Sequence, residues 1–215
     1  MTNILKYIKP SLELSKNIAI VGSSASLLES NSGKEIDKFN EVVRFNRAPT
    51  KNYEDFVGEK TSYRVVNNHV FDNFDLSKKG YSNQPKNFVR KLRNKNIIYI
   101  GPDIKPWRKR FINTHYSNNL FLFDYRKISE VKKALGINHK EHLQIGTIFI
   151  GLCIISNIVP TLYGFDLEPI KRTHYFEDRP GELGSLSHKI NKEISTLIEL
   201  QSSKKIIVNY WFKDE

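Results

Sequence analysis

The sequence predicts an α/β fold, a single doubly wound domain over residues 1–215 built on a mostly parallel sheet of about seven strands. Short β-rich segments alternate with helical ones along the chain. Several of the β-rich segments are continuous apolar runs, which is typical of strands covered on both faces. The length of 215 residues, with 39% hydrophobic and 27% charged residues, excludes a disordered or coiled-coil chain.

The predicted strands are short segments rich in β-branched and aromatic residues. They are Asn17–Val21, Glu41–Asn46, Tyr63–Asn67, Asn96–Ile100, Asn119–Phe123, Thr161–Phe165 and Lys205–Tyr210. Because helical segments separate many of them, we expect neighbouring strands to run parallel.

The segments between the strands predict helices of different character. Gln84–Asn94 is basic, and Ser129–Leu135 is short and amphipathic. Gln144–Ser156 is apolar nearly all round, which predicts a helix buried in the core. Ser187–Leu200 has one apolar stripe, made of Ile190, Ile194, Leu197 and Ile198. Residues 70–140 are rich in Asn, Lys and aromatic residues, and we expect them to carry a variable, partner-specific surface.

The formal net charge of +11 suits an anionic partner, which could be a nucleotide, a nucleic acid or a membrane surface. Basic residues cluster at Lys86–Lys95 and Lys105–Arg110. Such clusters can bind nucleic acid, an acidic glycan or anionic lipid headgroups, and they can equally be solvated helix faces. The charge alone does not choose among these partners.

The one cysteine, Cys153, excludes an intramolecular disulfide and favours a reducing compartment. Its apolar helix predicts a buried, unreactive thiol. Residues 1–15 do not resemble a signal peptide, and the longest apolar stretch, Gly146–Ile155, is too short to span a bilayer. We therefore expect a cytoplasmic protein and leave open a peripheral contact with the inner membrane face.

The first strand runs into a turn of small residues that could hold an anion. Gly22 lets the backbone turn sharply, and Ser23, Ser24 and Ser26 offer hydroxyl and N–H groups at a predicted helix start. The other interpretation is an ordinary turn in which a serine caps the helix. Asn46, at the end of the second strand, could bond a base or a ribose, or could simply form a turn before Ala48-Pro49.

Residues 18–61 resemble the long sialylmotif of the eukaryotic-type sialyltransferases, glycosyltransferase family 29. The resemblance rests on an Arg-x-Asn-x-Ala-Pro strand end and on residues around it that fall in register. These residues are Ile36-Asp37, Arg44, Asn46, Ala48-Pro49, Val57-Gly58 and Thr61.

Later segments resemble the other three motifs of the family, in the family's order. Leu143–Thr147 and Leu162–Asp166 resemble the short motif, His174–Glu177 the third motif, and His188 with Glu193 the very short motif. Some positions differ from the family pattern. Ser23 stands where the family has asparagine, Leu-Gln-Ile replaces Pro-Ser-Thr at the start of the short motif, and Asp166 replaces its last glycine.

The resemblance implies a Rossmann-like, GT-A-like fold and a short, soluble enzyme of microbial or viral type. It implies inverting, metal-independent transfer of sialic acid from CMP-sialic acid to a hydroxyl of a glycan or glycolipid. Kdo or a related CMP-activated acidic sugar is an alternative donor. An alternative of another class is a non-catalytic basic protein that binds nucleotides or nucleic acid, although we expect no nucleic-acid partner. Because the chain has no Asp-x-Asp motif, we expect no metal and no cofactor beyond the CMP-sugar co-substrate.

The resemblance also implies which residues form the site. His188 would be the general base, since it follows Ser187 at a predicted helix start where the helix dipole favours neutral imidazole. His174 would contact the CMP phosphate. We expect Glu193 to pack near the site without orienting His188, because five helical residues separate their directions by about 140°. The expected substrate-binding residues are Gly22, Ser23, Ser24, Asn46, Gln144, Gly146, Thr147, Gly164, Phe165, Asp166, Tyr175 and Glu193.

Overall fold

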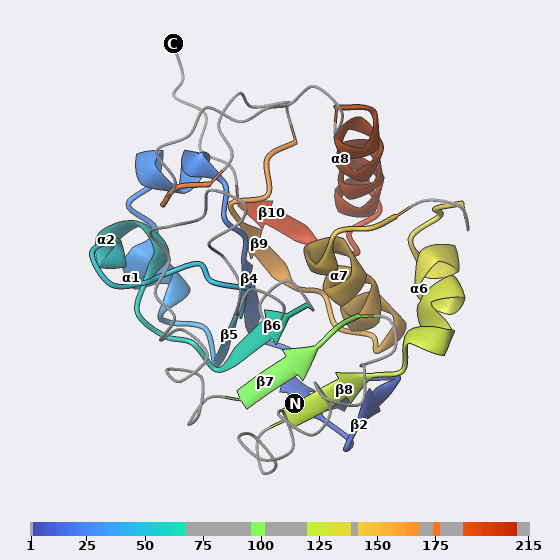
Figure 1. Ribbon diagram of the computed structural model, residues 1–215. Helices are drawn as coiled ribbons and strands as arrows, with labels where there is room; N and C mark the ends of the chain where they lie inside the picture. Colours follow the sequence, from blue (N-terminus) through green and yellow to red (C-terminus); the bar gives the residue numbers. More distant parts are fainter. Residues whose placement is uncertain are drawn as a thin grey trace, which may run out of the picture.

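The computed structural model describes residues 2–67, 96–101, 120–138, 142–167, 174–176 and 187–209. A twisted eight-stranded sheet runs through these residues, and helices lie on both of its faces (Figure 1). The strands of this sheet follow the order β10-β9-β4-β5-β6-β7-β8-β2. All neighbouring pairs are parallel except β2 with β8. The predicted α/β class with a mostly parallel sheet is therefore confirmed.

Each predicted strand is present, with slightly shorter bounds. They are β4 (Ile18–Val21), β5 (Glu41–Phe45), β6 (Tyr63–Val66), β7 (Asn96–Tyr99), β8 (Leu120–Phe123), β9 (Thr161–Tyr163) and β10 (Ile207–Asn209). Three very short strands near the N-terminus were not predicted from the sequence: β1 (Thr2–Ile4), β2 (Ile8–Lys9) and β3 (Glu13–Ser15). Strands of two or three residues show no measurable periodicity, although this segment buries Leu5, Ile8, Leu12 and Leu14 in the core.

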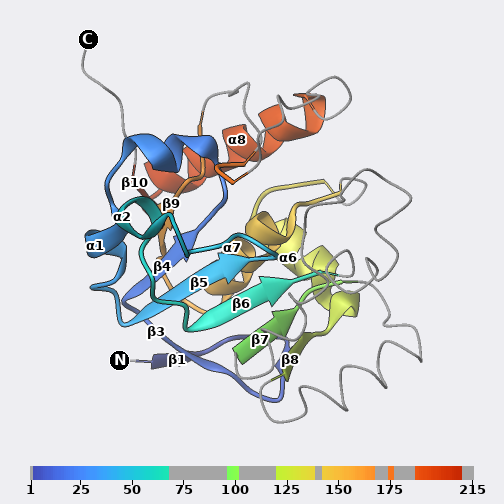
Figure 2. The same ribbon diagram turned by 60° about the vertical axis from the view of Figure 1, so that its left-hand side comes forward.

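The helices are η1 (Ala25–Glu29), α1 (Gly33–Ile36), α2 (Glu54–Val57), η3 (Tyr125–Lys127), α6 (Ile128–Ala134), α7 (Ile145–Ile155) and α8 (Ser187–Ser202). Figure 2 shows α1 and α2 on one face of the sheet and α6 and α7 on the other. The predicted helix Gln84–Asn94, both basic clusters and most of region 70–140 lie outside the described residues. The assignment of residues 1–215 to one domain stays a prediction.

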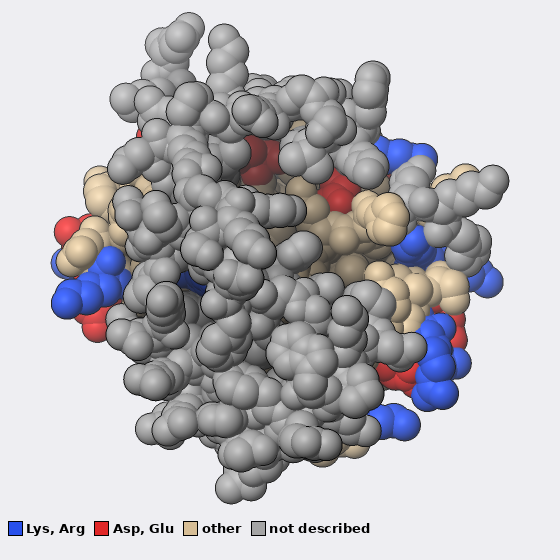
Figure 3. Space-filling model, in the orientation of Figure 1, with Lys and Arg blue, Asp and Glu red and all other residues tan. Residues whose placement is uncertain are grey.

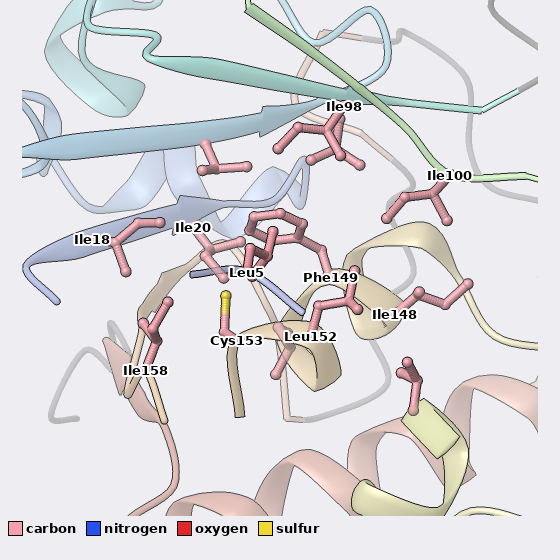
Figure 4. Packing of buried hydrophobic residues seen from close by; sticks show 14 of the residues in the cluster. Leu5, Ile18, Ile20, Ile98, Ile100, Ile148, Phe149, Leu152, Cys153 and Ile158 are labelled. Carbon is pink, nitrogen blue, oxygen red and sulfur yellow. The ribbon is translucent and has the colours of Figure 1, made fainter. Parts of the chain in front are cut away.

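Helix α7 forms the centre of the larger core, as its apolar sequence predicts. Figure 4 shows Phe149 and Cys153 of α7 beside Ile20 of β4, and all three side chains are fully buried. Burial raises the pKa of the Cys153 thiol, so the thiol stays neutral. None of the helices in the described ranges has the length and apolar character of a membrane span.

The buried side of helix α8 overlaps the predicted stripe at Leu197 but does not include Ile198. Ile198, expected on the apolar stripe, is 44% exposed, whereas Thr196, Leu197 and Leu200 are buried. The half-buried Glu193 lies on the same side, four residues before Leu197. A stripe drawn from isoleucines and leucines alone omits Glu193 and Thr196, because both are polar.

Strands β4 and β9 meet at the point where the chain changes direction across the sheet. From β4 the chain continues to β5 on one side, and from β9 it continues to β10 on the other. The ends of the two strands approach closely, since the Gly22 N–H donates to the carbonyl of Tyr163 at 2.8 Å. A Cβ at Gly22 would lie 2.3 Å from the carbonyl oxygen of Gly164, so only glycine fits there.

We expect Gly22→Ala to lower the free energy of unfolding by about 3 kcal/mol, because the added methyl group meets a backbone carbonyl that cannot rotate away. Urea denaturation measures the loss. Gly136→Ala is the control: Gly136 has a φ of +70° with open space around it, so its cost is conformational, about 1 to 2 kcal/mol. A Gly22→Ala variant as stable as the wild-type chain would contradict the close approach.

Candidate active site

Four segments that are distant in sequence meet where β4, β5 and β9 end. Phe165, just after β9, lies next to a residue of each of the other three segments: Gly22, Phe45 and Gly146. Its ring would lie about 3 Å from a Cβ built at either Gly22 or Gly146, and it packs edge-to-face on Phe45 with 6.2 Å between ring centroids. Gly22, Gly146 and Phe165 therefore converge at the carboxyl edge of the sheet, where open α/β folds bind ligands.

Asp166 joins the end of β9 to the turn after β4. Its carboxylate accepts hydrogen bonds from the hydroxyl groups of Ser24 and Ser26. Ser24 also caps η1, because its side chain accepts from the Ser26 N–H. The capping interpretation of this turn is therefore confirmed for Ser24, whose hydroxyl also bonds to Asp166. The interpretation that the turn holds an anion stays a prediction. Ser26 was predicted to lie in this turn, but its bond to Asp166 was not predicted.

Ser23 pairs with His174, which comes from a distant part of the chain. The Oγ of Ser23 and the Nδ1 of His174 are 2.8 Å apart, and the Tyr175 N–H donates to the Ser23 carbonyl at 3.1 Å. The imidazole stacks on Phe176, with 5.3 Å between ring centroids and 8° between ring planes. This stacking of Phe176 on His174 was not predicted from the sequence. The sequence feature that could have indicated it is an aromatic residue two positions after the histidine.

Tyr175 anchors this segment from inside the fold. Its side chain is buried, and its hydroxyl donates to the carbonyl of Pro49. The ring also packs edge-to-face on Tyr53, with 5.0 Å between centroids. Burial raises the pKa of Tyr175 to about 12, so the phenol stays protonated. The structure thus places the Tyr175 side chain in the core, and not at the open edge where a substrate contact was expected.

Asn46 lies at the same edge, directly after β5. Its φ of +41° is a conformation that asparagine tolerates better than most residues. The side-chain oxygen accepts from the Asn67 N–H at 3.3 Å, and the main-chain oxygen accepts from Arg64 at 3.0 Å. Asn46 is therefore a turn residue, as one interpretation of the sequence held, and it remains only half-buried beside the site.

Glu193 of α8 holds the N-terminus of α7. Its carboxylate accepts from the Gln144 N–H at 2.9 Å and from the Thr147 hydroxyl at 2.6 Å. Burial raises the pKa of Glu193, and these two hydrogen bonds partly offset the rise. Thr147 and Glu193 therefore connect two helices, consistent with the packing role expected of Glu193. The exposed Gln144 contributes its backbone to the same contact.

His188 is in the first turn of α8, as expected, but its side chain lies outside the described residues. Within the described ranges, no three His, Cys, Asp or Glu side chains are grouped so that they could hold a metal ion. Among the described residues, Lys and Arg lie beside Asp and Glu at the left and right edges of the view in Figure 3.

The buried Arg44 holds the loop after α2. Its guanidinium group donates to the carbonyls of Val57, Gly58 and Lys60 and to the Thr61 hydroxyl, at 2.6 to 3.2 Å. Burial lowers the pKa of Arg44 to about 10, which leaves it charged at neutral pH. These residues of the predicted long motif thus build the scaffold and do not line the site.

Comparisons with known proteins identify the family of this chain. The model of glycosyltransferase family 29 (sialyltransferase) matches residues 5–205. A beta-galactoside alpha-2,6-sialyltransferase 2 of Xenopus tropicalis is 47% identical over 184 residues, which is 74% of this chain and 34% of that protein. The protein of the same name from Danio rerio is 29% identical over 190 residues, which is 75% of this chain and 34% of that one. The chain thus spans about a third of the length of these curated relatives.

The fold also resembles solved structures. A crystal structure of a mammalian sialyltransferase superposes with a TM-score of 0.64 at 20% identity, over 89% of this chain and 68% of that one. A second structure, of a mammalian sialyltransferase in complex with Gal-beta-1-3GalNAc-ortho-nitrophenol, gives a TM-score of 0.62. Since the family model matches residues 5–205, nearly the whole chain, the chain belongs to glycosyltransferase family 29, the sialyltransferases.

Proposed function

We propose that the chain transfers sialic acid from CMP-sialic acid to a hydroxyl of a glycan or glycolipid, with inversion and without a metal. The observation that carries the proposal is the convergence of Gly22, Gly146 and Phe165 at the sheet edge, beside the Ser23–His174 pair. Membership of the sialyltransferase family supports it. The CMP moiety would lie at this edge, with the sugar directed toward the first turn of α8.

The proposed reaction is a single displacement. The acceptor hydroxyl oxygen attacks the anomeric carbon of the donor, and the bond from that carbon to the phosphate oxygen breaks. His188 takes the proton of the acceptor hydroxyl, because the positive end of α8 favours its neutral form. His174 stabilises the negative charge that develops on the departing CMP phosphate.

The donor is the first point to test. We expect the purified protein, with EDTA present, to release CMP from CMP-sialic acid when a galactose-terminated glycan is supplied. If the site needs no metal, the rate of CMP release with EDTA should equal the rate without it. Transfer from CMP-Kdo instead would identify Kdo as the donor sugar. Kdo is the alternative because Asp166 stands where the family motif has glycine, at the edge of the sheet where the donor would bind. CMP binding without turnover of either donor would favour the non-catalytic alternative.

The two histidines should have separable effects. We expect His188→Ala to lower kcat by about 10² to 10⁴, the usual contribution of a general base, with little change in CMP affinity. His174→Ala should weaken both turnover and CMP binding, because its partner is the phosphate. His142→Ala, which removes an exposed histidine, is the control. Calorimetry with CMP and a transfer assay measure both quantities. Full activity of His188→Ala would refute the base assignment.

A further inference from the structure

Ser23 has a more specific role than contact with the nucleotide. Three features restrict the His174 ring: its neighbour Tyr175 is buried, one ring face stacks on Phe176, and Nδ1 meets the Ser23 hydroxyl at 2.8 Å. A histidine held in this way has a single ring nitrogen left for a ligand, Nε2. The Ser23 hydroxyl is already hydrogen-bonded to the ring before any nucleotide arrives.

We propose that Ser23 is a positioning residue that acts through His174, so that Nε2–H is the group presented to the donor's phosphate. This inference rests on the proposed function. A hydroxyl suits the task because it both donates and accepts. It donates to Nδ1 when the ring is neutral with its proton on Nε2, and it accepts from Nδ1–H when the ring is protonated. In both of these states Nε2 donates and Ser23 keeps its hydrogen bond. In the third state, neutral with the proton on Nδ1, the hydroxyl accepts and Nε2 cannot donate; a phosphate, which only accepts, selects the first two states. Ser23 therefore fixes the direction of the ring, and the phosphate selects the proton on Nε2.

The backbone strengthens the pair. The Tyr175 N–H donates to the Ser23 carbonyl, so main chain and side chain of Ser23 hold the same short segment. Ser23 follows Gly22, whose position is fixed by the close approach of Gly164. The rigid ends of β4 and β9 therefore set the orientation of the His174 ring. A hydrogen-bond donor must be held on rigid elements in this way if it is to be placed precisely.

Binding of CMP and of cytidine, which lacks the phosphate, separates this role from direct contact. We expect Ser23→Ala to weaken CMP binding about tenfold, the effect of one hydrogen bond, and to leave cytidine binding unchanged. Ser23→Thr, which keeps the hydroxyl, should restore CMP affinity. The double variant with His174→Ala should bind CMP no more weakly than His174→Ala alone. Ser203→Ala, which removes the hydroxyl of an exposed residue directly after α8 that donates only to the nearby Leu200 carbonyl, is the control.

Equal weakening of CMP and cytidine binding in Ser23→Ala would overturn the proposal, as would losses that add in the double variant. Nitrogen-15 NMR of the histidine rings tests the pair without any ligand. The Nδ1 resonance of His174 should shift in Ser23→Ala and stay unchanged in Ser203→Ala. An unshifted Nδ1 resonance would overturn the proposal. A wild-type chain that binds no CMP would instead refute the proposed function, and the Nδ1 resonance would still decide the role of Ser23.

Discussion

The contact between the backbones of Gly22 and Gly164 is the constraint on which the site depends. Parallel strands that lead to opposite sides of a sheet leave a crevice between their ends, and its width is set by how closely those ends approach. Here no side chain separates them, because a Cβ on Gly22 would overlap the Gly164 carbonyl oxygen. The residues that follow each glycine are thereby brought into hydrogen-bond range, and Ser24 meets Asp166 across the junction.

The motif residues divide into two groups by their contacts. Arg44, Tyr175 and Glu193 direct their polar atoms at the backbone of other segments: a loop, the Pro49 carbonyl and the N-terminus of α7. They fix the edges of the site and are themselves partly or wholly buried. Ser23 and His174 remain half-buried at the sheet edge, where a ligand can reach them. The motifs therefore contain buried residues that hold the scaffold and half-buried residues at the sheet edge, and a match to a motif does not by itself separate the two groups.

The sequence was sufficient for the strands of the parallel sheet and for the burial of α7, because these depend on continuous apolar runs. It was not sufficient where tertiary contacts decide. The strand β2 has two residues and no pattern of its own, and it forms only because β8 offers an open edge. The buried side of α8 includes Thr196, and its burial could not be predicted from an apolar stripe because threonine is polar. The partners of Asp166 and His174 lie more than a hundred residues away in the chain, so local spacing could not identify them.

The central claim is that a CMP-sugar binds where β4 and β9 end. A crystal structure of the protein with CMP tests it most directly. The predicted result is CMP at the carboxyl edge of the sheet, with a phosphate oxygen within about 3 Å of the His174 ring and the nucleoside beside Phe165. CMP bound at the opposite edge of the sheet, or at this edge with its phosphate turned away from His174, would contradict it.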